Sequence, residues 1–559
     1  MPTRRHAMWL HLGGTAAALV LAAPTAAQVR LDRADPTIVE QALPRPATTT
    51  APAPNEPPRL VVDPSVLAEP GSIEHTGTIT AVVLDGAEGM DVAPLAAVYA
   101  DVVGREPSRA DLARFVARIA AAAREAGYPL ASASIGAQTI ANGILHVQLD
   151  PGRIDAVRVI GARSGAADAL LGRALVTGRA PRRRELEQAL LLVGDLPGVR
   201  VTGSQYVRQN GFGILLVTIE SDRANAYAQV DNRGSSEIGP VRSTLLANVR
   251  NVAQSGDEFA LLAAQTPLQP TEFAFVRGRY SAPVDHAGSV LSVSASYGRS
   301  HPGASLQRLD VIGHSVDAAV AYTRPLLRSR THSLWANAEF RGLSVEQTLA
   351  GRGLRDDRLT TLTGSLNGFA PAGPGVLRGE VGTTVGLPFG GVTHEGDART
   401  SRADGDARFV TAGYTVDWTV SLLKPVTMVI ASSGQIASRP LLATIELGAG
   451  GPGFGRGYDY AERTGDRGIL GSLELRADAG RIVPGIIDRL QLYTFVDGGE
   501  VGNLRGGVGG GTLLSSGGGA RLGVGATDGM IEVALPLNTD RFDTGDRSPR
   551  VSLRLSRVF

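Results

Sequence analysis

The sequence contains no cysteine and only one lysine, Lys424, in 559 residues. The absence of cysteine excludes disulfides, thiolate chemistry and cysteine-bound metals. The 55 basic residues are almost all arginine and balance 54 acidic residues, so the net charge is only +1. Such a chain has no long-range field with which to hold nucleic acid, and we expect no nucleic-acid partner.

Long apolar runs are also missing. After the first thirty residues no stretch approaches 18 uninterrupted apolar residues, and aromatic residues make up only 5% of the chain. A helix that spans a membrane needs about 20 apolar residues, so none is expected. Glycine, in contrast, occurs 70 times. This density weakens helices and indicates turns, tight packing or disorder.

The first residues have the pattern of an export signal. Arg4 and Arg5 precede an apolar run from Leu12 to Ala23, and small residues follow as far as Ala27. The run is too short for a membrane anchor but suits a cleaved signal peptide over residues 1–27. The exported chain would be periplasmic, extracellular or in the outer membrane.

A short amphipathic segment and a proline-rich segment follow. Asp35 is placed to cap a helix that has Pro36 at its first position and Ile38 and Leu43 on its apolar side. We expect this helix within residues 28–43. Residues 44–75 are rich in proline, which favours an extended linker. Composition equally allows a disordered N-terminal tail with no function.

Two segments between residues 76 and 223 repeat one another. The motif GREP at 104–107 returns as GRAP at 178–181, and GILHV at 143–147 returns as GILLV at 213–217. Repetition of this kind indicates duplicated structural units. We place the units at residues 76–150 and 151–223, each of a size that suits a small two-layer α+β domain.

Each unit combines one clear helix with a closing strand. Ser108 and Asp111 form a capping-box pattern at the start of the first helix. One face of that helix is apolar through Leu112, Phe115, Val116, Ile119 and Ala123, and the corresponding face in the second unit carries Leu186, Ala189, Leu190 and Val193. The order of signals and the phrases AGYPLA and GILHVQLDPGRIDAVRVIG resemble the POTRA domains of periplasmic polypeptide-transport proteins.

From residue 224 to residue 559 the helical periodicity disappears and alternation takes its place. Apolar residues at 291, 293, 295 and 297 alternate with serine, and rows at 531–537 and 551–555 behave in the same way. One apolar face beside one small or polar face is typical of membrane β-barrel strands, with lipid outside and a wet lumen. A soluble β-sandwich or solenoid is the alternative. The final Phe559 follows such a strand and resembles the assembly signal of outer-membrane barrels.

A long glycine-rich segment interrupts the barrel pattern between strands expected at 441–447 and 469–475. Residues 448–453 match GxGxxG, but no helix follows to present its N-terminus to a phosphate, so the nucleotide-site interpretation fails. Further on, Leu490 and Leu492 set the outward parity, which turns Phe495 and Asp497 into the lumen. A buried aspartate needs a partner, and Arg456 in the glycine-rich loop could supply one.

These residues carry a family resemblance. Arg456-Gly457-Tyr458 resembles the (V)RG(F/Y) motif of the POTRA-barrel superfamily, and Phe495-Val496-Asp497-Gly498-Gly499 resembles its FxDxG motif. With two POTRA-like units, a linker and an N-terminal helix, the chain resembles two-partner secretion transporters of the haemolysin activator and filamentous haemagglutinin exporter type. Gly455 departs from the motif, which usually has valine there.

The resemblance implies α+β periplasmic POTRA domains followed by an all-β, 16-stranded transmembrane β-barrel in the outer membrane. It implies that Arg456 pairs with Asp497 to hold a loop inside the barrel, and that the helix in 28–43 plugs the pore. The partner would be a large secreted β-helical exoprotein, such as an adhesin, a haemolysin or a contact-dependent toxin. The barrel assembly machinery and outer-membrane lipid would be further partners.

The other functional classes have weaker support. Residues 313–317 (GHSVD) approach a GxSxG elbow but lack its last glycine, Asp356 and Asp357 stand in charged loop-like sequence, and no histidines have HExxH spacing. We therefore expect no catalytic residues, no metal and no cofactor. The main alternative is an outer-membrane protein insertion or assembly factor of the same superfamily, and a passive porin is the third.

Overall fold

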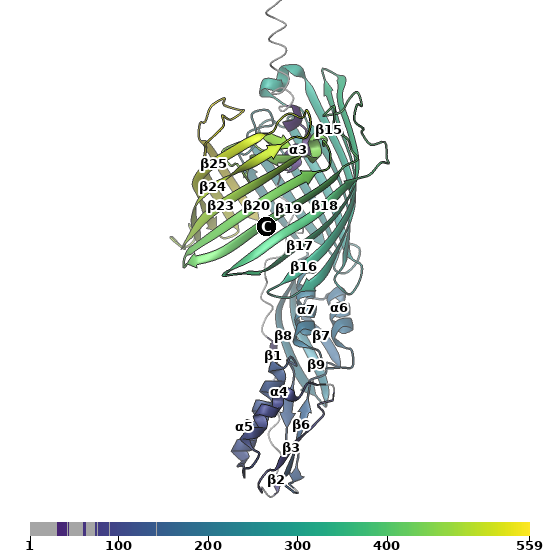
Figure 1. Cartoon of the computed structure of the whole chain (residues 1–559), viewed down its shortest axis with the longest axis vertical. Helices are drawn as coiled ribbons and strands as arrows, with labels where there is room; N and C mark the ends of the chain where they lie inside the picture. Colours follow the sequence, from purple (N-terminus) through teal and green to yellow (C-terminus); the bar gives the residue numbers. More distant parts are fainter. Residues whose placement is uncertain are drawn as a thin grey trace, which may run out of the picture.

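The computed structural model describes residues 31–41, 43, 60–62, 73–74, 77–88, 90–140 and 142–559. The expected signal peptide and most of the expected linker lie outside these residues. Two small α+β units follow one another along the long axis of the molecule and lead into a large β-barrel (Figure 1). In the part of the chain that the structure describes, no helix is both long enough and apolar enough to cross a membrane.

The first unit contains a three-stranded sheet covered by helices. The sheet order is β3 (Ala81–Asp85), β6 (Ile144–Asp150) and β4 (Ser132–Ser134), with β3 parallel and β4 antiparallel to β6. Between β3 and β4 lie α4 (Ala93–Ala96), the 3-10 helix η3 (Ala97–Asp101) and α5 (Arg109–Glu125). Two short strands, β2 (Ile73–Glu74) and β5 (Gln138–Thr139), pair in parallel.

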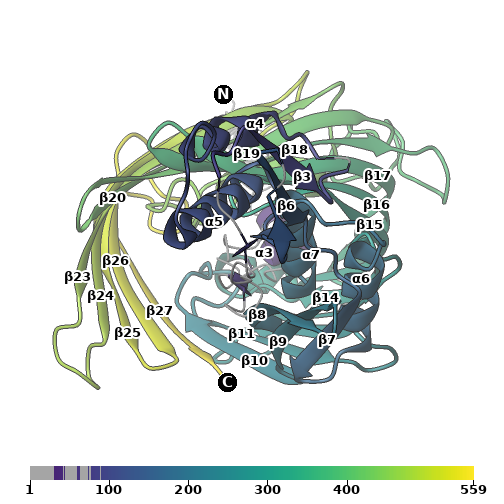
Figure 2. The ribbon, with the colours of Figure 1, turned by 90° about the horizontal axis from the view of Figure 1, so that it is seen from below.

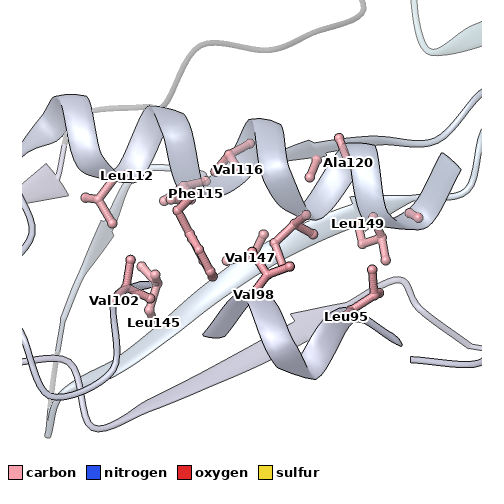
Figure 3. Close-up of a cluster of buried hydrophobic side chains, with 14 of the residues drawn as sticks. Leu95, Val98, Val102, Leu112, Phe115, Val116, Ala120, Leu145, Val147 and Leu149 are labelled. Carbon is pink, nitrogen blue, oxygen red and sulfur yellow. The ribbon is translucent and has the colours of Figure 1, made fainter. Parts of the chain in front are cut away.

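Helix α5 begins at the capping box that the sequence predicts. The Ser108 hydroxyl accepts a hydrogen bond from the Asp111 amide at 3.2 Å, and the Asp111 carboxylate accepts one from the Ser108 amide at 2.9 Å. The hydrogen bonds from Ser108 lower the pKa of Asp111 below its ordinary value. The apolar face of α5 packs on the sheet, where Phe115 meets Leu145 and Val147 (Figure 3).

The second unit repeats this arrangement with a larger sheet. Its strands have the order β1 (Leu60–Val62), β8 (Val199–Gln209), β9 (Phe212–Ser221) and β7 (Ala156–Gly161). Helices α6 (Gly165–Leu175) and α7 (Arg183–Gly194) lie between β7 and β8, and their apolar residues share one core with Tyr206, Leu215 and Val217. The two units meet where the Arg183 amide donates to the Gly127 carbonyl oxygen at 2.9 Å.

A closed antiparallel barrel of 16 strands occupies residues 224–559, all of which the structure describes. The strands are β10 (Ala224–Asp231), β11 (Arg242–Arg250), β12 (Glu258–Gln265), β13 (Phe273–Pro283), β14 (Val290–Ser300), β15 (Val311–Arg328), β16 (Ser333–Leu349), β17 (Arg352–Ala372), β18 (Gly375–Gly386), β19 (Val410–Leu423), β20 (Val426–Ala437), β23 (Arg467–Gly480), β24 (Arg489–Gly502), β25 (Gly511–Val524), β26 (Thr527–Pro536) and β27 (Arg550–Val558). Each strand pairs with its neighbour in sequence order, and β10 pairs with β27 to close the ring. The predicted α+β units and 16-stranded barrel are confirmed.

The outer wall of the barrel is apolar because the side chains alternate along every strand. Tyr297 on β14, Val316 on β15 and Leu555 on β27 are 44%, 55% and 59% exposed, whereas their neighbours Ser296, Ser315 and Ser556 are buried. Apolar side chains exposed in such numbers are expected on a wall that faces lipid.

Two local predictions are wrong. Residues 441–447 do not form a wall strand, because the chain leaves the wall after β20 and turns into the lumen, where Leu441 and Leu442 are fully buried. Their apolar character serves packing inside the barrel. Asp356 and Asp357 do not lie in a loop either, since both are on β17, where the Asp357 carboxylate accepts a hydrogen bond from the Ser401 amide at 3.0 Å.

Candidate functional site

One end of the barrel lumen, the end away from the two α+β units, is filled by two segments. The first is α3 (Pro36–Gln41), preceded by a helical turn at residues 31–33, so the helix is shorter than the range in which it was expected. The second is residues 438–466, which we call the inner loop. It contains η5 (Ala443–Ile445) and a hairpin of β21 (Leu447–Ala449) and β22 (Arg463–Gly465). Figures 1 and 2 show α3 inside the barrel.

The sequence forms α3 at this point because Asp35 caps it. The Asp35 Oδ1 atom accepts hydrogen bonds from the Thr37 amide at 2.8 Å and from the Thr37 hydroxyl at 2.7 Å. Pro36 follows at the first helical position, where its missing N–H costs nothing.

Ion pairs hold α3 and the turn before it to both the wall and the inner loop. Arg33 contacts Asp459 of the inner loop at 2.6 Å, and Asp459 also pairs with Arg550 on β27. On the wall, Asp32 pairs with Arg355 and Glu40 contacts Arg277 at 2.5 Å.

Hydrogen bonds and apolar contacts complete the seat of α3. The Gln41 amide nitrogen donates to the Thr444 carbonyl oxygen at 3.1 Å, and the Tyr460 hydroxyl donates to the Gln41 Oε1 atom at 3.0 Å. Val39 and Leu43 pack in an apolar cluster with Phe273 of the wall. The helix and the turn before it therefore contact both the inner loop and the barrel wall.

Arg456 at the tip of the inner loop lies among three wall carboxylates. Its Nη1 atom donates to Glu474 on β23 at 2.6 Å and to Glu532 on β26 at 3.4 Å. Its Nε atom lies 3.1 Å from the Asp497 Oδ2 atom without the alignment of a hydrogen bond, so that contact is purely electrostatic. The guanidinium carbon lies 4.0 Å from the centroid of the Phe495 ring, a cation–π distance.

Asp497 and Phe495 reach this site because of the parity of β24. Both side chains are buried in the lumen, while Leu492 on the same strand is 50% exposed on the outer wall. Asp497 also accepts hydrogen bonds from the Arg456 amide at 3.2 Å and from the Ser515 hydroxyl. The carboxylate therefore binds the loop through its backbone as well as its side chain.

Sequence reasoning missed Glu474 and Glu532, although the same alternation could have turned both inward, since Ile531 and Val533 beside Glu532 are exposed. Leu473 and Leu475 are exposed on the outer wall, so the residue between them must face inward. Arg476 and Arg521 contact Glu474 at 2.6 and 2.9 Å, and these pairs compensate the charge that the site buries.

The remaining motif residues have mainly steric roles. A Cβ atom at Gly457 would lie 3.0 Å from the Pro536 nitrogen, and one at Gly499 would lie 2.4 Å from the Ile469 carbonyl oxygen. Tyr458 is fully buried, and its hydroxyl donates to the Asn538 Oδ1 atom at 3.0 Å. Gly455 has a φ of +85°, a conformation that a β-branched valine rarely adopts.

Phe559 lies apart from this cluster, at the seam between the first and last strands. Its amide donates to the Ala226 carbonyl oxygen at 2.8 Å, and its side chain is 66% exposed.

A second arginine, Arg402, joins three loops at the closed end. It lies in the segment between β18 and β19 and is 5% exposed. Its Nη1 atom donates to Glu446 and Asp466 of the inner loop, both at 2.9 Å, and its Nη2 atom donates to the Leu504 carbonyl oxygen at 2.5 Å. Nothing in the local sequence around Arg402 indicates this role, because these three partners are 44 to 102 positions away.

The opposite end of the lumen is open. A cavity of about 1240 Å³ lies between the second α+β unit and strands β10–β18. Hydrogen bonds hold the unit against the barrel. The Nε and Nη2 atoms of Arg328 in the barrel each donate to the Asp195 carboxylate of the unit at 2.7 Å. The hydroxyl of Ser255 in the barrel accepts a hydrogen bond from the Ala166 amide of the unit at 3.0 Å.

The ion pairs and hydrogen bonds of this arrangement hold two segments inside the barrel. Residues 448–453, which match GxGxxG, lie in the β21–β22 hairpin with no helix after them. Among the described residues, no three histidine, aspartate or glutamate side chains gather as metal ligands.

Comparison with known proteins agrees with this geometry. A model of the haemolysin secretion/activation proteins ShlB/FhaC/HecB matches residues 213–522, and a model of the ShlB-type POTRA domain matches residues 78–152. The heme/hemopexin transporter protein HuxB of Haemophilus influenzae strain 86-028NP is 24% identical over 393 residues, which cover 68% of each chain.

Two solved structures show the same fold. CdiB from Escherichia coli aligns with a TM-score of 0.69 and 17% identity, covering 99% of this chain and all of that one. BamA from Haemophilus ducreyi, lacking POTRA domains 1–3, aligns with a TM-score of 0.53 and 13% identity, covering 87% of this chain and all of that one. Because the first family model spans more than half of the chain, this protein belongs to the ShlB/FhaC/HecB haemolysin secretion/activation family, the two-partner secretion transporters of the outer membrane.

Proposed function

We propose that the POTRA units capture an unfolded exoprotein in the periplasm and that the barrel passes it to the cell surface once α3 and the inner loop move. The observation that carries this proposal is the contrast within the lumen. The POTRA end is an open cavity, while the surface end is closed by residues held through contacts that can break and re-form.

In this proposal α3 is a plug. Together with the turn before it, α3 is seated by three ion pairs, hydrogen bonds of Gln41 and a small apolar cluster, and a client that enters the cavity could displace these contacts one by one. Arg456 keeps the inner loop at rest by joining Glu474, Asp497 and Glu532. These contacts would break as the loop swings aside and re-form when it returns, so a loop without Arg456 would lie unanchored in the path of the client.

Capture by strand addition suits an unfolded client, because main-chain hydrogen bonds provide affinity without requiring one sequence. We infer that the exoprotein is a large β-helical protein, such as an adhesin, a haemolysin or a contact-dependent toxin. Folding of the client outside the cell would supply direction, so the mechanism that we propose uses no catalytic site and no cofactor. Phe559 would be read by the barrel assembly machinery, and the apolar outer wall would contact outer-membrane lipid.

The test is an export assay. The full chain is co-expressed with a large candidate exoprotein whose gene lies in the same genome, and that protein is measured in the medium. We expect release only when the chain is present, and we expect a variant lacking residues 77–223 to insert its barrel but export nothing. Release without the chain would contradict the proposal.

The same assay separates the alternative. An outer-membrane assembly factor would change the levels of many outer-membrane proteins when it is removed. Normal levels of those proteins, together with loss of one exported client, support two-partner secretion.

A further inference from the structure

The open cavity at the POTRA end lies against one side of the barrel, strands β10–β18. All of its lining residues come from the second POTRA unit, the adjacent turns and strands β10–β18. At about 1240 Å³ it exceeds the roughly 300–1,000 Å³ of typical small-molecule pockets. Its size and position suit a length of polypeptide.

Strands β15–β17 line this cavity mainly with neutral groups, whereas β11–β13 contribute the ion-paired Arg250, Glu258 and Arg279. Hydroxyl and carboxamide groups line the cavity across β15, β16 and β17, and we call this set the amide strip: Thr323, Asn337, Thr363, Ser365 and Asn367. The Thr323 hydroxyl donates to the Asn337 Oδ1 atom at 2.9 Å, and the Asn337 amide nitrogen donates to the Asn367 Oδ1 atom at 2.7 Å. Neighbouring strands are about 4.8 Å apart, so polar groups recur at short intervals around the wall.

The opposite wall has a different character. Its lumen face on β23–β26 carries Glu474, Arg476, Arg521 and Glu532, which contact one another or Arg456. A chain that lay on this wall would have to compete with buried ion pairs, whose disruption is costly.

A chain that lies on the neutral amide strip does not have to break ion pairs. Each carboxamide can donate and accept hydrogen bonds, as a peptide group does, and each hydroxyl can do both. The strip can therefore bind the main chain of any extended segment and let it go again at little cost. Glu339 and Glu380 also line the cavity, and their carboxylates would disfavour acidic segments of a client.

We propose that the amide strip is the track along which the extended exoprotein lies as it leaves the second POTRA unit, so that transit follows the β15–β17 wall and avoids the charged wall. This inference rests on the export function proposed above. It adds which side of the lumen the exoprotein contacts, and that the strip binds the main chain of the exoprotein and not its side chains.

Because the chain has no cysteine, single-cysteine variants of the full protein test the track directly. Asn337→Cys, Thr363→Cys and Asn367→Cys sample the strip. Gln491→Cys, near the POTRA end of the charged wall, is the matched control. Thr494→Cys faces outward on the same strand and is the negative control for a position in lipid. The probe is the exported protein identified in the export assay, carrying one cysteine and halted by a folded C-terminal fusion.

We expect cross-linking to the halted probe to be at least fivefold higher at the strip than at Gln491→Cys, with none at Thr494→Cys. Equal yields on the two walls, or more at Gln491→Cys, would overturn the track while the export function stands. If the cysteine-free parent exports nothing, the proposed function itself fails.

A second measurement uses charge. Asn337→Asp combined with Asn367→Asp should slow export of an acidic client severalfold, whereas Gln491→Glu should leave the rate unchanged. Equal slowing by both variants would contradict recognition by the strip. Heat-modifiable migration on gels confirms that each variant has a folded barrel.

Discussion

The two ends of the barrel lumen are built from the same strands but have opposite contents. At the surface end, arginines at 33, 402 and 456 are buried among carboxylates of the wall and the inner loop. At the POTRA end, an open cavity is lined by neutral side chains on β15–β17 and by charged ones on other strands, such as the Arg250–Glu258 pair. Alternation decides only that a residue faces inward. Whether the interior is closed depends on which segments return to it.

The difference has an energetic consequence. A buried ion pair gains little net stability when complete, but loss of one partner leaves an uncompensated charge and costs about 3–5 kcal/mol. The surface end should therefore be closed or open, with few intermediate states. The POTRA end can be hydrated or occupied at little cost. The following changes test this contrast.

The largest effect is expected at the centre of the closed end. Arg456→Ala leaves Glu474, Asp497 and Glu532 facing one another without their shared cation. We expect export to fall at least about tenfold while the barrel remains inserted, because the loss of a buried partner costs about 3–5 kcal/mol. Arg489→Ala, which removes an exposed ion pair, is the matched control. Unchanged secretion by Arg456→Ala would remove the proposed role of the site.

Removal of the plug is the next largest change. Deletion of residues 28–43 takes away α3 with its contacts to Asp459, Arg355 and Arg277, so the channel conductance in planar bilayers should rise severalfold. The substitution Glu40→Gln should produce a smaller rise, since it weakens only one contact. A deletion variant with the conductance of the full chain would exclude α3 as the plug.

The junction at Arg402 should have a moderate effect. Arg402→Ala separates the segment between β18 and β19 from the inner loop, so we expect faster proteolysis of the surface loops and brief channel openings. Arg408→Ala, which removes a half-exposed arginine from the same segment, is the control. Identical proteolysis of the two variants would show that Arg402 does not hold the closed end.

The smallest effect is expected at the open end. Asp195→Ala breaks the contact between the second POTRA unit and the buried Arg328, which keeps its hydrogen bonds to Ser329 and Ser333, so the loss is that of a charged hydrogen bond, about 1.5–3 kcal/mol. Distances between spin labels on the unit and the barrel should broaden, while export falls only about twofold. Loss of export as complete as in Arg456→Ala would reverse the contrast between the two ends.

Much of this architecture could be predicted from local patterns. The capping box at Ser108, the apolar faces of α5 and α7, and the alternation of the barrel strands each depend on residues a few positions apart. The inward direction of Asp497 follows from the same local rule. Residues 441–447 misled this reasoning because an apolar segment buried in a lumen resembles one that faces lipid.

The amino-acid sequence by itself determined the two α+β units, the alternating barrel and the inward face of each strand, because these depend on the periodicity of neighbouring residues. Only the tertiary structure decided the partners of each buried charge. Glu474 and Glu532 reach Arg456, and Asp459 joins Arg33 to Arg550, across 18 to 426 positions of sequence. These ion pairs form because the barrel closes and the inner loop folds back into the lumen, so no local sequence pattern predicts them.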